Sequence, residues 1–258
     1  MEASWIVDRA IARDAAADDG GPVACSVEDL AVEMAKRRAG GEPLQYVLGV
    51  ASFRHLELAV GPGVLVPRPE TEVLVERALA RIPVRGAVVD VGTGSGAIAL
   101  SVSHERPDAR VWATDDSADA LHYAVANRQT LGLEIEIVNG ELLDGLPDDL
   151  KGSIDVVVSN PPYVAYSERE LLGSDVIAHE PHHALFAGSD GLAVLTRLAT
   201  DSLAWLRGGG WLVCEIGYEQ RERAAALLEH KGYVDIGIHA DLTGRPRIVE
   251  GRKGAGRE

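Results

Sequence analysis

The sequence predicts an α/β fold in which helices cover both faces of a mainly parallel β-sheet. Short, continuous apolar runs alternate along the chain with longer segments of helical periodicity. Strands that are buried on both faces of a parallel sheet have this appearance. The length of 258 residues also suffices to bury a large core without disulfides or metal ions. We therefore expect one large domain with a small appendage.

The N-terminal segment, residues 1–42, is rich in alanine and predicts two or three short helices. Its apolar residues recur at helical spacing in two stripes, separated by a turn at residues 18–22. The stripes are Trp5, Ile6, Ala10 and Ile11, and Val27, Leu30, Ala31 and Met34. These helices are too few to bury a core of their own. They either cap the larger domain or contact the substrate.

The next segment, residues 43–66, predicts a β-hairpin or an extended linker. Two short β-like runs, at residues 45–49 and 56–60, are bracketed by glycines and end at Gly61-Pro62-Gly63. A helix should begin after this segment. Thr71 is its candidate N-cap, because it precedes an apolar stripe and carries a hydroxyl.

The remainder of the chain alternates between strands and helices. The predicted strands are residues 87–91, 110–114, 135–138, 155–159, 211–216, 234–239 and 247–250. One predicted helix follows a glycine turn and ends at about residue 104, and the others span residues 118–131, 192–206 and 220–231. The last two strands are close in sequence, which favours an antiparallel pair at one edge. Residues 253–258 should form a flexible, polar tail.

Composition and charge exclude several classes of protein. No apolar stretch is long enough for a transmembrane helix and the N-terminus has no signal-peptide core, so we expect a cytoplasmic protein. The net charge of −15 argues against stable binding of a nucleic-acid backbone. Cys25 and Cys214 have neither a disulfide-framework nor a metal-binding spacing, and Cys214 should lie in the core. We expect a monomer without membrane contact.

A glycine-rich turn, Asp90-Val91-Gly92-Thr93-Gly94-Ser95-Gly96, lies where the first predicted strand of the sheet meets its helix. Glycines at this point let a ligand approach the backbone, and a helix start offers free N–H groups. Asp115 ends the next strand, where a carboxylate can accept both hydroxyls of a ribose. The pattern indicates a cofactor that contains adenosine. NAD is also compatible with Gly92-x-Gly94-x-x-Ala97.

The tetrapeptide Asn160-Pro161-Pro162-Tyr163 favours one kind of reaction. It follows a predicted strand and should lie at the carboxyl edge of the sheet, beside the ligand crevice. Two prolines remove backbone donors and leave a corner that is rich in acceptors, next to an aromatic ring. Such a corner can hold a planar NH2 group by both hydrogens and aim its nitrogen at an electrophile. Methyl transfer to an amino or amide nitrogen needs this arrangement, whereas a nicotinamide dehydrogenase does not.

These two motifs together resemble S-adenosylmethionine-dependent methyltransferases that act on adenine amino groups or on the glutamine amide. Other motifs narrow the resemblance to the HemK/PrmC family of protein-(glutamine-N(5)) methyltransferases, over about residues 35–250. They are Gly41 to Gly49, Phe53, Val66 to Glu72, Glu180-Pro181, Asp190 to Leu192, Glu215 to Gly217 and Asp241 to Arg247. The resemblance implies a Rossmann-like, seven-stranded methyltransferase sheet at residues 67–252, a hairpin linker at 43–66 and a substrate-recognition region at 1–42.

The resemblance also implies a reaction and a set of site residues. Members of the family transfer a methyl group from S-adenosyl-L-methionine to the glutamine of the Gly-Gly-Gln (GGQ) loop in class I peptide chain release factors, leaving S-adenosyl-L-homocysteine. The implied cofactor-binding residues are Gly92, Thr93, Gly94, Ser95, Gly96, Asp115, Glu141, Leu142 and Asn160. The implied catalytic residues are Asn160, Pro161 and Tyr163. The implied substrate-binding residues are Phe53, Asn160, Pro161, Pro162 and Tyr163.

Alternatives and departures accompany this interpretation. A ribosomal-protein glutamine is an alternative substrate, and N(6)-adenine of DNA is a more distant one that the acidic charge disfavours. The run His179-Glu180-Pro181-His182-His183 matches a zinc-protease pattern that requires a helix, which Pro181 disfavours, so we expect no metal site. Glu141 stands where the family usually has Asp. The N-terminal region is shorter than the family's, so we expect a missing helix or a start further upstream.

Overall fold

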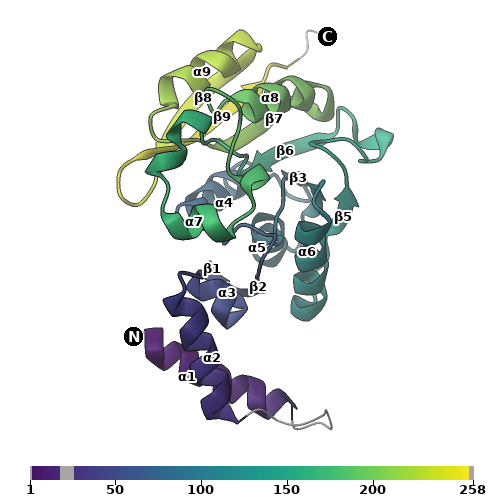
Figure 1. Cartoon of the computed structure of the whole chain (residues 1–258). Helices are drawn as coiled ribbons and strands as arrows, with labels where there is room; N and C mark the ends of the chain where they lie inside the picture. Colours follow the sequence, from purple (N-terminus) through teal and green to yellow (C-terminus); the bar gives the residue numbers. More distant parts are fainter. Residues whose placement is uncertain (1, 18–25, 256–258) are drawn as a thin grey trace.

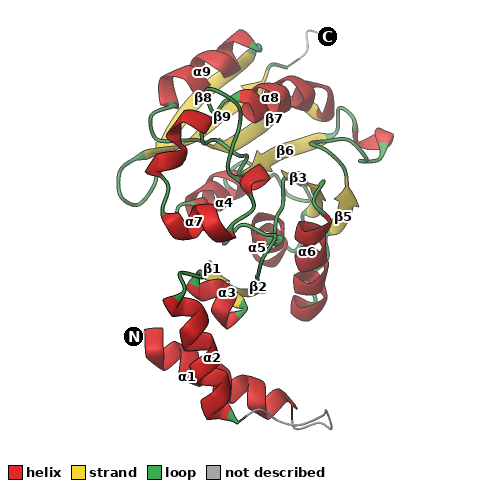
Figure 2. Cartoon of the chain, viewed as in Figure 1, coloured by secondary structure: helices red, strands yellow, loops and turns green. Residues whose placement is uncertain are grey.

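A seven-stranded sheet forms the larger part of the molecule in the computed structural model, which describes residues 2–17 and 26–255 (Figures 1 and 2). The strand order is β5-β4-β3-β6-β7-β9-β8. The strands are β3 (Ala87–Val91), β4 (Arg110–Asp115), β5 (Glu136–Asn139), β6 (Ile154–Ser159), β7 (Leu206–Glu215), β8 (Tyr233–Ala240) and β9 (Pro246–Lys253). β9 is antiparallel to β7 and β8, and the other neighbours are parallel. The predicted α/β class and the antiparallel edge are confirmed.

Helices cover both faces of this sheet. They are α4 (Thr71–Leu79), α5 (Ala97–Glu105), α6 (Ala118–Leu131), α8 (Ala193–Trp205) and α9 (Arg221–His230). Successive side chains of a strand point to opposite faces. Val88 therefore packs in one apolar cluster with residues of α4 and α5, while Val89 packs in another with residues of α8 and α9. This two-sided burial explains why the central strands are apolar throughout.

The N-terminal helices project away from the sheet (Figure 1). These are α1 (Glu2–Ala17), α2 (Val27–Ala39) and α3 (Leu44–Leu48). Ile6, Ala10 and Met34 form a small core with Val47 of α3, as expected for two of the predicted apolar positions in α1. The prediction for the other two positions is wrong, because Trp5 and Ile11 are 47% and 51% exposed.

The predicted strand at residues 45–49 is also wrong. These residues form α3 with its C-cap, which begins after Pro43 and ends at Gly49 in the left-handed conformation, with φ 76°. Tyr46 and Val47 are both buried, but in two different apolar clusters. A short apolar run is therefore compatible with either a strand or a buried helical turn. The hairpin consists instead of β1 (Val50–Phe53) and β2 (Leu56–Ala59).

Two boundaries at the C-terminal part differ from the prediction. β7 begins at Leu206 instead of Trp211, because the glycines at 208–210 continue the strand beside an irregularity in its pairing with β6. β9 extends through Lys253, whose Nζ donates to the carbonyls of Leu203 and Leu206 at 2.6 and 2.7 Å. Lys253 is thus anchored and not part of a flexible tail. The predicted turn at 18–22, Cys25 and residues 256–258 lie outside the described residues.

The chain between β6 and α8 crosses the carboxyl edge of the sheet as short pieces. These pieces are η2 (Tyr166–Leu171), α7 (Ser174–His179) and η3 (His182–Ala184). A further short helix, η1 (Asp148–Leu150), precedes β6.

Cys214 is fully buried, as predicted. Within residues 2–17 and 26–255, no helix is long and apolar enough to cross a membrane.

Candidate active site

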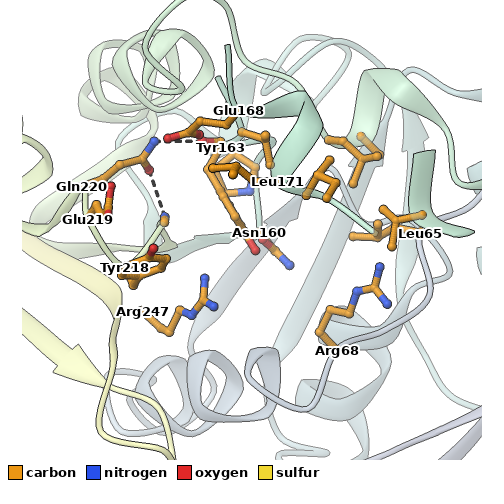
Figure 3. Close-up of a pocket in the computed structure, with 17 residues that line it drawn as sticks. Leu65, Arg68, Asn160, Tyr163, Glu168, Leu171, Tyr218, Glu219, Gln220 and Arg247 are labelled. Carbon is orange, nitrogen blue, oxygen red and sulfur yellow. Dashed lines mark hydrogen bonds between the residues drawn. The ribbon is translucent and has the colours of Figure 1, made fainter. Parts of the chain in front are cut away.

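A cavity of about 410 Å³ opens at the carboxyl ends of β6 and β7 (Figure 3). Asn160, Pro161 and Tyr163 line it from the loop after β6. The loop after β7, Arg68 before α4 and Arg247 of β9 complete the wall. In open parallel sheets, ligands bind at this edge because the loops after neighbouring strands meet there.

A chain of hydrogen bonds orients the side chain of Asn160. Its Nδ2 donates to the hydroxyl of Thr71 at 3.1 Å, and that hydroxyl donates to Glu215 Oε2 at 2.7 Å. The hydroxyl of Tyr163 donates to the other oxygen, Oε1, at 3.3 Å. Thr71 was predicted as an N-cap, which is wrong: the cap position is Glu70, without a side-chain bond, and the Thr71 hydroxyl faces inward.

Burial controls the titration of these groups. Glu215 is 1% exposed, and burial raises the pKa of its carboxyl group to about 7 although Thr71, Tyr163 and the charge of Arg247 favour the ionised form. Burial and the charge of Glu215 also raise the pKa of the Tyr163 phenol. The phenol therefore stays protonated and can only donate its proton to Glu215.

Two acceptors at the cavity have no hydrogen-bond partner among the described residues. They are Asn160 Oδ1 and the Pro161 carbonyl. The neighbouring Tyr163 carbonyl is already used, because it accepts from Gln220 Nε2 at 2.8 Å. Two free acceptors in one cavity can each accept one of the two hydrogens of a primary amide.

Two arginines flank Asn160 in the close-up (Figure 3). Arg68 donates to both carboxylate oxygens of Glu180, at 2.6 and 2.7 Å. Burial raises the pKa of Glu180, and the Arg68 charge opposes that shift. Arg247 lies 3.5 Å from Asp241, and its buried Nε has no hydrogen-bond partner among the described residues. The cavity therefore combines free acceptors with two arginines that are paired with Glu180 and Asp241. The carboxylates of Glu168 and Glu219 also line it.

The glycine-rich turn lies outside this cavity, at the carboxyl end of β3. Gly92, Gly94 and Gly96 have φ of 69°, 58° and 85°, a region that side chains rarely adopt. Thr93 and Ser95 between them are buried. A Cβ added at Gly92 would meet no atom within 4 Å, so the backbone there faces open space.

Two carboxylates border this turn. Asp115 Oδ2 accepts from the N–H of Gly94 at 2.9 Å, and burial raises the pKa of Asp115. Asp90 Oδ2 accepts from Thr93 Oγ1 at 2.6 Å, whereas its buried Oδ1 has no partner among the described residues. Burial raises the pKa of Asp90 to about 7. A buried acceptor without a donor beside open backbone fits a ligand that carries an amino group.

Asn127 of α6 connects the hairpin to the glycine-rich turn. Its amide exchanges two hydrogen bonds with the backbone of Ala59 in β2, at 2.7 and 3.0 Å, and also donates to the Ser95 carbonyl at 2.8 Å. Because Asn127 is 2% exposed, these bonds are shielded from water. The linker is thus fixed to the part of the sheet that carries the turn.

Besides the glycine-rich turn and Asp115, three further predicted site residues lie apart from the cavity, and Pro162, between Pro161 and Tyr163, does not line it either. Phe53, predicted as a wall of the glutamine site, is 1% exposed and packs with Leu58 and Leu74 in the core, so that prediction needs correction. Glu141 is exposed and forms an ion pair with Arg197 at 2.6 Å. Leu142 follows it with φ 52°, and its carbonyl accepts from Thr114 Oγ1 at 2.6 Å.

The histidine motif forms no metal site in the described part of the chain. α7 ends at His179, and the chain is extended at Glu180 and Pro181. His182 and His183 then begin η3, so the histidines do not share one helical face. The carboxylate of Glu180 is instead engaged by Arg68.

Comparison with known proteins identifies the family. The Methyltransferase small domain family matches residues 69–214. A release factor glutamine methyltransferase from Bordetella pertussis is 41% identical over 256 residues, which cover 97% of this chain and 94% of that protein. One from Mycolicibacterium smegmatis is 43% identical over 235 residues, or 90% and 81% of the two chains. The chain belongs to the release factor glutamine methyltransferase family. The resemblance inferred from its motifs is confirmed.

The fold is shared with more distant methyltransferases. A crystal structure of a methyltransferase from Pyrococcus furiosus is 17% identical, with a TM-score of 0.59 over 86% of this chain and 98% of that one. At this identity the likeness concerns the fold alone. It agrees with the seven-stranded methyltransferase sheet that the motifs imply.

Sequence reasoning assigned no site role to four residues that the structure brings to the site. Thr71, Glu215, Arg68 and Arg247 all lie within motifs that carried the family resemblance, so a signal was present. The roles of Thr71, Glu215 and Arg68 were not readable, because their partners are far away in sequence: Thr71 and Glu215 are 144 positions apart, and Arg68 and Glu180 are 112 positions apart. Asp90 was likewise quoted only as the first residue of the glycine-rich motif.

Proposed function

We propose that this chain transfers a methyl group from S-adenosyl-L-methionine to the side-chain amide nitrogen of the glutamine in the GGQ loop of a class I peptide chain release factor. The observation that carries the proposal is the pair of free acceptors, Asn160 Oδ1 and the Pro161 carbonyl, at the base of the cavity. The names of the family relatives support the choice of release factor.

The glycine-rich turn supports the choice of cofactor. In this proposal, Gly92 to Gly96 hold its methionine end, the free Oδ1 of Asp90 accepts from its amino group, and Asp115 binds its ribose. Glu141 and Leu142 flank its adenine, as the family resemblance implies. When bound, the cofactor supplies an electrophilic methyl carbon and leaves as S-adenosyl-L-homocysteine.

The residues around Asn160 act by orientation. An amide nitrogen is a poor nucleophile because its lone pair is delocalised into the carbonyl group. Acceptors on both N–H groups draw the hydrogens away from the nitrogen, which raises its electron density, and they fix its direction; such positioning can lower the barrier by up to about 7–11 kcal/mol in ideal cases. Pro162 keeps the corner rigid, and Tyr163 forms its aromatic wall. The nitrogen loses one proton after methyl transfer, so no strong base is needed.

The surroundings of the cavity support a peptide loop as the substrate. Leu171 at its rim is 82% exposed, an arrangement that suits contact with another protein. We assign recognition of the body of the release factor to the N-terminal helices, where Val7 and Val32 are about half exposed on one groove. Since release factors act in the cytoplasm, we place the enzyme there, acting as a monomer.

Transfer of label from S-adenosyl-L-methionine to three purified acceptors tests the proposal. The acceptors are a class I release factor, a large-subunit ribosomal protein and duplex DNA, each protein paired with its Gln→Ala variant. Label on the release factor that is lost with its variant is the expected result. Label only on the ribosomal protein would change the substrate and keep the chemistry, whereas label only on DNA would contradict amide methylation.

A further inference from the structure

We propose that Thr71 and Glu215 are positioning residues which set the orientation of the Asn160 amide, so that ionised Glu215 presents Oδ1 to the substrate and protonated Glu215 does not. This inference rests on the proposed function. It assigns a role to two buried residues that do not line the cavity.

The hydroxyl of Thr71 forces the orientation because it has a single hydrogen. That hydrogen is donated to Glu215 Oε2 at 2.7 Å, so the oxygen of Thr71 can only accept from Asn160. The Asn160 group that faces Thr71 at 3.1 Å must then be the NH2 group. Its Oδ1 is consequently directed away from Thr71 and is available to a substrate amide hydrogen.

The surroundings of Glu215 allow both charge states near neutral pH. The groups that act on it are the Tyr163 hydroxyl after β6, Thr71 at the start of α4, Glu70 before it and Arg247 on β9. Arg247 and the two hydroxyls favour the carboxylate, while burial and Glu70 favour the acid. Burial is the largest effect and raises the pKa of Glu215 to about 7.

Protonation of Glu215 reverses the direction of the chain. The acid can donate its proton to the Thr71 oxygen, which frees the Thr71 hydrogen to donate to Asn160. Asn160 then satisfies that donor by a half-turn of its amide, which places Oδ1 toward Thr71 and the NH2 group toward the cavity. The NH2 group of Asn160 then faces the NH2 group of the substrate glutamine, and two donors cannot form a hydrogen bond, so the glutamine is not held. Methyl transfer should therefore increase with pH as Glu215 ionises.

Three variants test this relay. In Glu215→Gln, the charge is lost and the new amide can donate to Thr71 as the protonated acid does; we expect kcat to fall roughly 10–100-fold, less than the roughly 10²–10³-fold cost of removing a group that itself holds the substrate, because Glu215 acts through Asn160. Thr71→Val keeps the shape and removes the hydroxyl, with a similar expected loss. Thr71→Ser keeps the hydroxyl and is the matched control, with kcat and its pH dependence close to those of the native protein.

The readout is kcat for release factor methylation from about pH 6 to 8 at saturating cofactor. Saturation matters because Asp90 also titrates near pH 7 and acts on the cofactor side. The native protein and Thr71→Ser should show an increase centred near pH 7 that is absent in Glu215→Gln and Thr71→Val. Cofactor Kd and the unfolding temperature, measured in parallel, should exclude general damage to the fold.

The outcomes separate the relay from the proposed function. If native protein and Thr71→Val transfer methyl at equal rates with the same pH profile, the relay is wrong and the function stands. A native profile that is flat over this range overturns the switch without use of any variant. If the native protein methylates no release factor at any pH, the proposed function fails, and the relay fails with it.

Discussion

Glu215 and Glu250 occupy adjacent antiparallel strands, β7 and β9, and each is 1% exposed. Their neighbours differ. Burial tends to raise the pKa of Glu250, but hydrogen bonds from Arg81 and Arg77, together with the imidazole of His239 nearby, lower that pKa to about 2. Glu215 receives hydrogen bonds from two hydroxyls and has Arg247 as the nearest cation, and its pKa is raised to about 7. Two carboxyl groups with equally little exposed surface thus have pKa values shifted in opposite directions, because Glu215 is enclosed more deeply and lacks the two arginines that bond to Glu250.

The cations determine which task each glutamate can perform. Glu250 stays ionised and connects β9 with Arg77 of α4 and with Arg81, which follows α4. A group with so large a preference for one charge state cannot respond to pH near neutrality. Glu215 is poised between two charge states, next to Asn160 and Tyr163. A carboxyl group with a pKa near neutrality can change its charge, and with it the direction of the hydrogen bonds around it.

The largest expected effect comes from removal of the charge of Glu250. Glu250→Gln leaves Arg77, Arg81 and His239 facing one another without a counter-charge. We expect a loss of about 3 kcal/mol in the free energy of unfolding, the lower part of the range for a broken buried pair, because the arginines reach water. Urea denaturation measures this loss, and kcat per folded molecule should stay within twofold of native. An unchanged denaturation midpoint would show that the cluster is not structural.

The second effect concerns pH and has opposite signs for the two glutamates. The lowered pKa of Glu250 contributes stability above about pH 4.5 that is lost as pH falls toward 2. The raised pKa of Glu215 contributes stability below about pH 4.5 that is lost as pH rises through 7. Glu215→Gln has no carboxyl group to titrate at this position and keeps this stability at high pH. The free energy of unfolding of the variant minus that of the native protein should therefore increase by about 2 kcal/mol from pH 5 to pH 8.

Denaturation of both proteins at the two pH values checks this second prediction. Glu215→Gln is then less active and relatively more stable at pH 8, a combination that damage to the core cannot produce. Equal pH dependence of the two proteins would mean that Glu215 titrates as an ordinary carboxyl group.

The smallest effect is expected at an exposed carboxylate. Glu141 and Arg197 form an ion pair whose side chains are 54% and 56% exposed. Hydrogen bonding to Arg197 lowers the pKa of Glu141, but water screens exposed pairs. Glu141→Gln should leave the unfolding midpoint unchanged. If Glu141 flanks adenine, titration calorimetry should show a several-fold weaker cofactor Kd, and an unchanged Kd would remove it from the cofactor site.

The parts of the site that sequence reasoning predicted are those formed by neighbouring residues. The glycine-rich turn and the Asn160-Pro161-Pro162-Tyr163 corner act through local backbone shape, which their residue types reveal directly. Thr71 shows the limit. Its position before an apolar stripe indicates an N-cap, but Glu215, far away in sequence, provides a better partner for its hydroxyl.

Burial was the other property that the sequence did not reveal. Phe53 has the residue type of a pocket wall, yet the hairpin turns it into the core between Leu58 and Leu74. The run at 45–49 was apolar enough for a strand and became α3, since Gly49 in a left-handed conformation ends a helix readily. In both cases, long-range packing decided between local structures that were equally compatible with the sequence.

The transfer rate of Asn160→Ala tests most directly whether this corner holds the glutamine amide. Single-turnover methylation of a class I release factor at saturating S-adenosyl-L-methionine separates orientation of the amide from cofactor binding. We predict a rate at saturating cofactor about 10²–10³ times lower than native, the cost of removing one preorganised hydrogen-bonding group. A full transfer rate in Asn160→Ala would contradict the account.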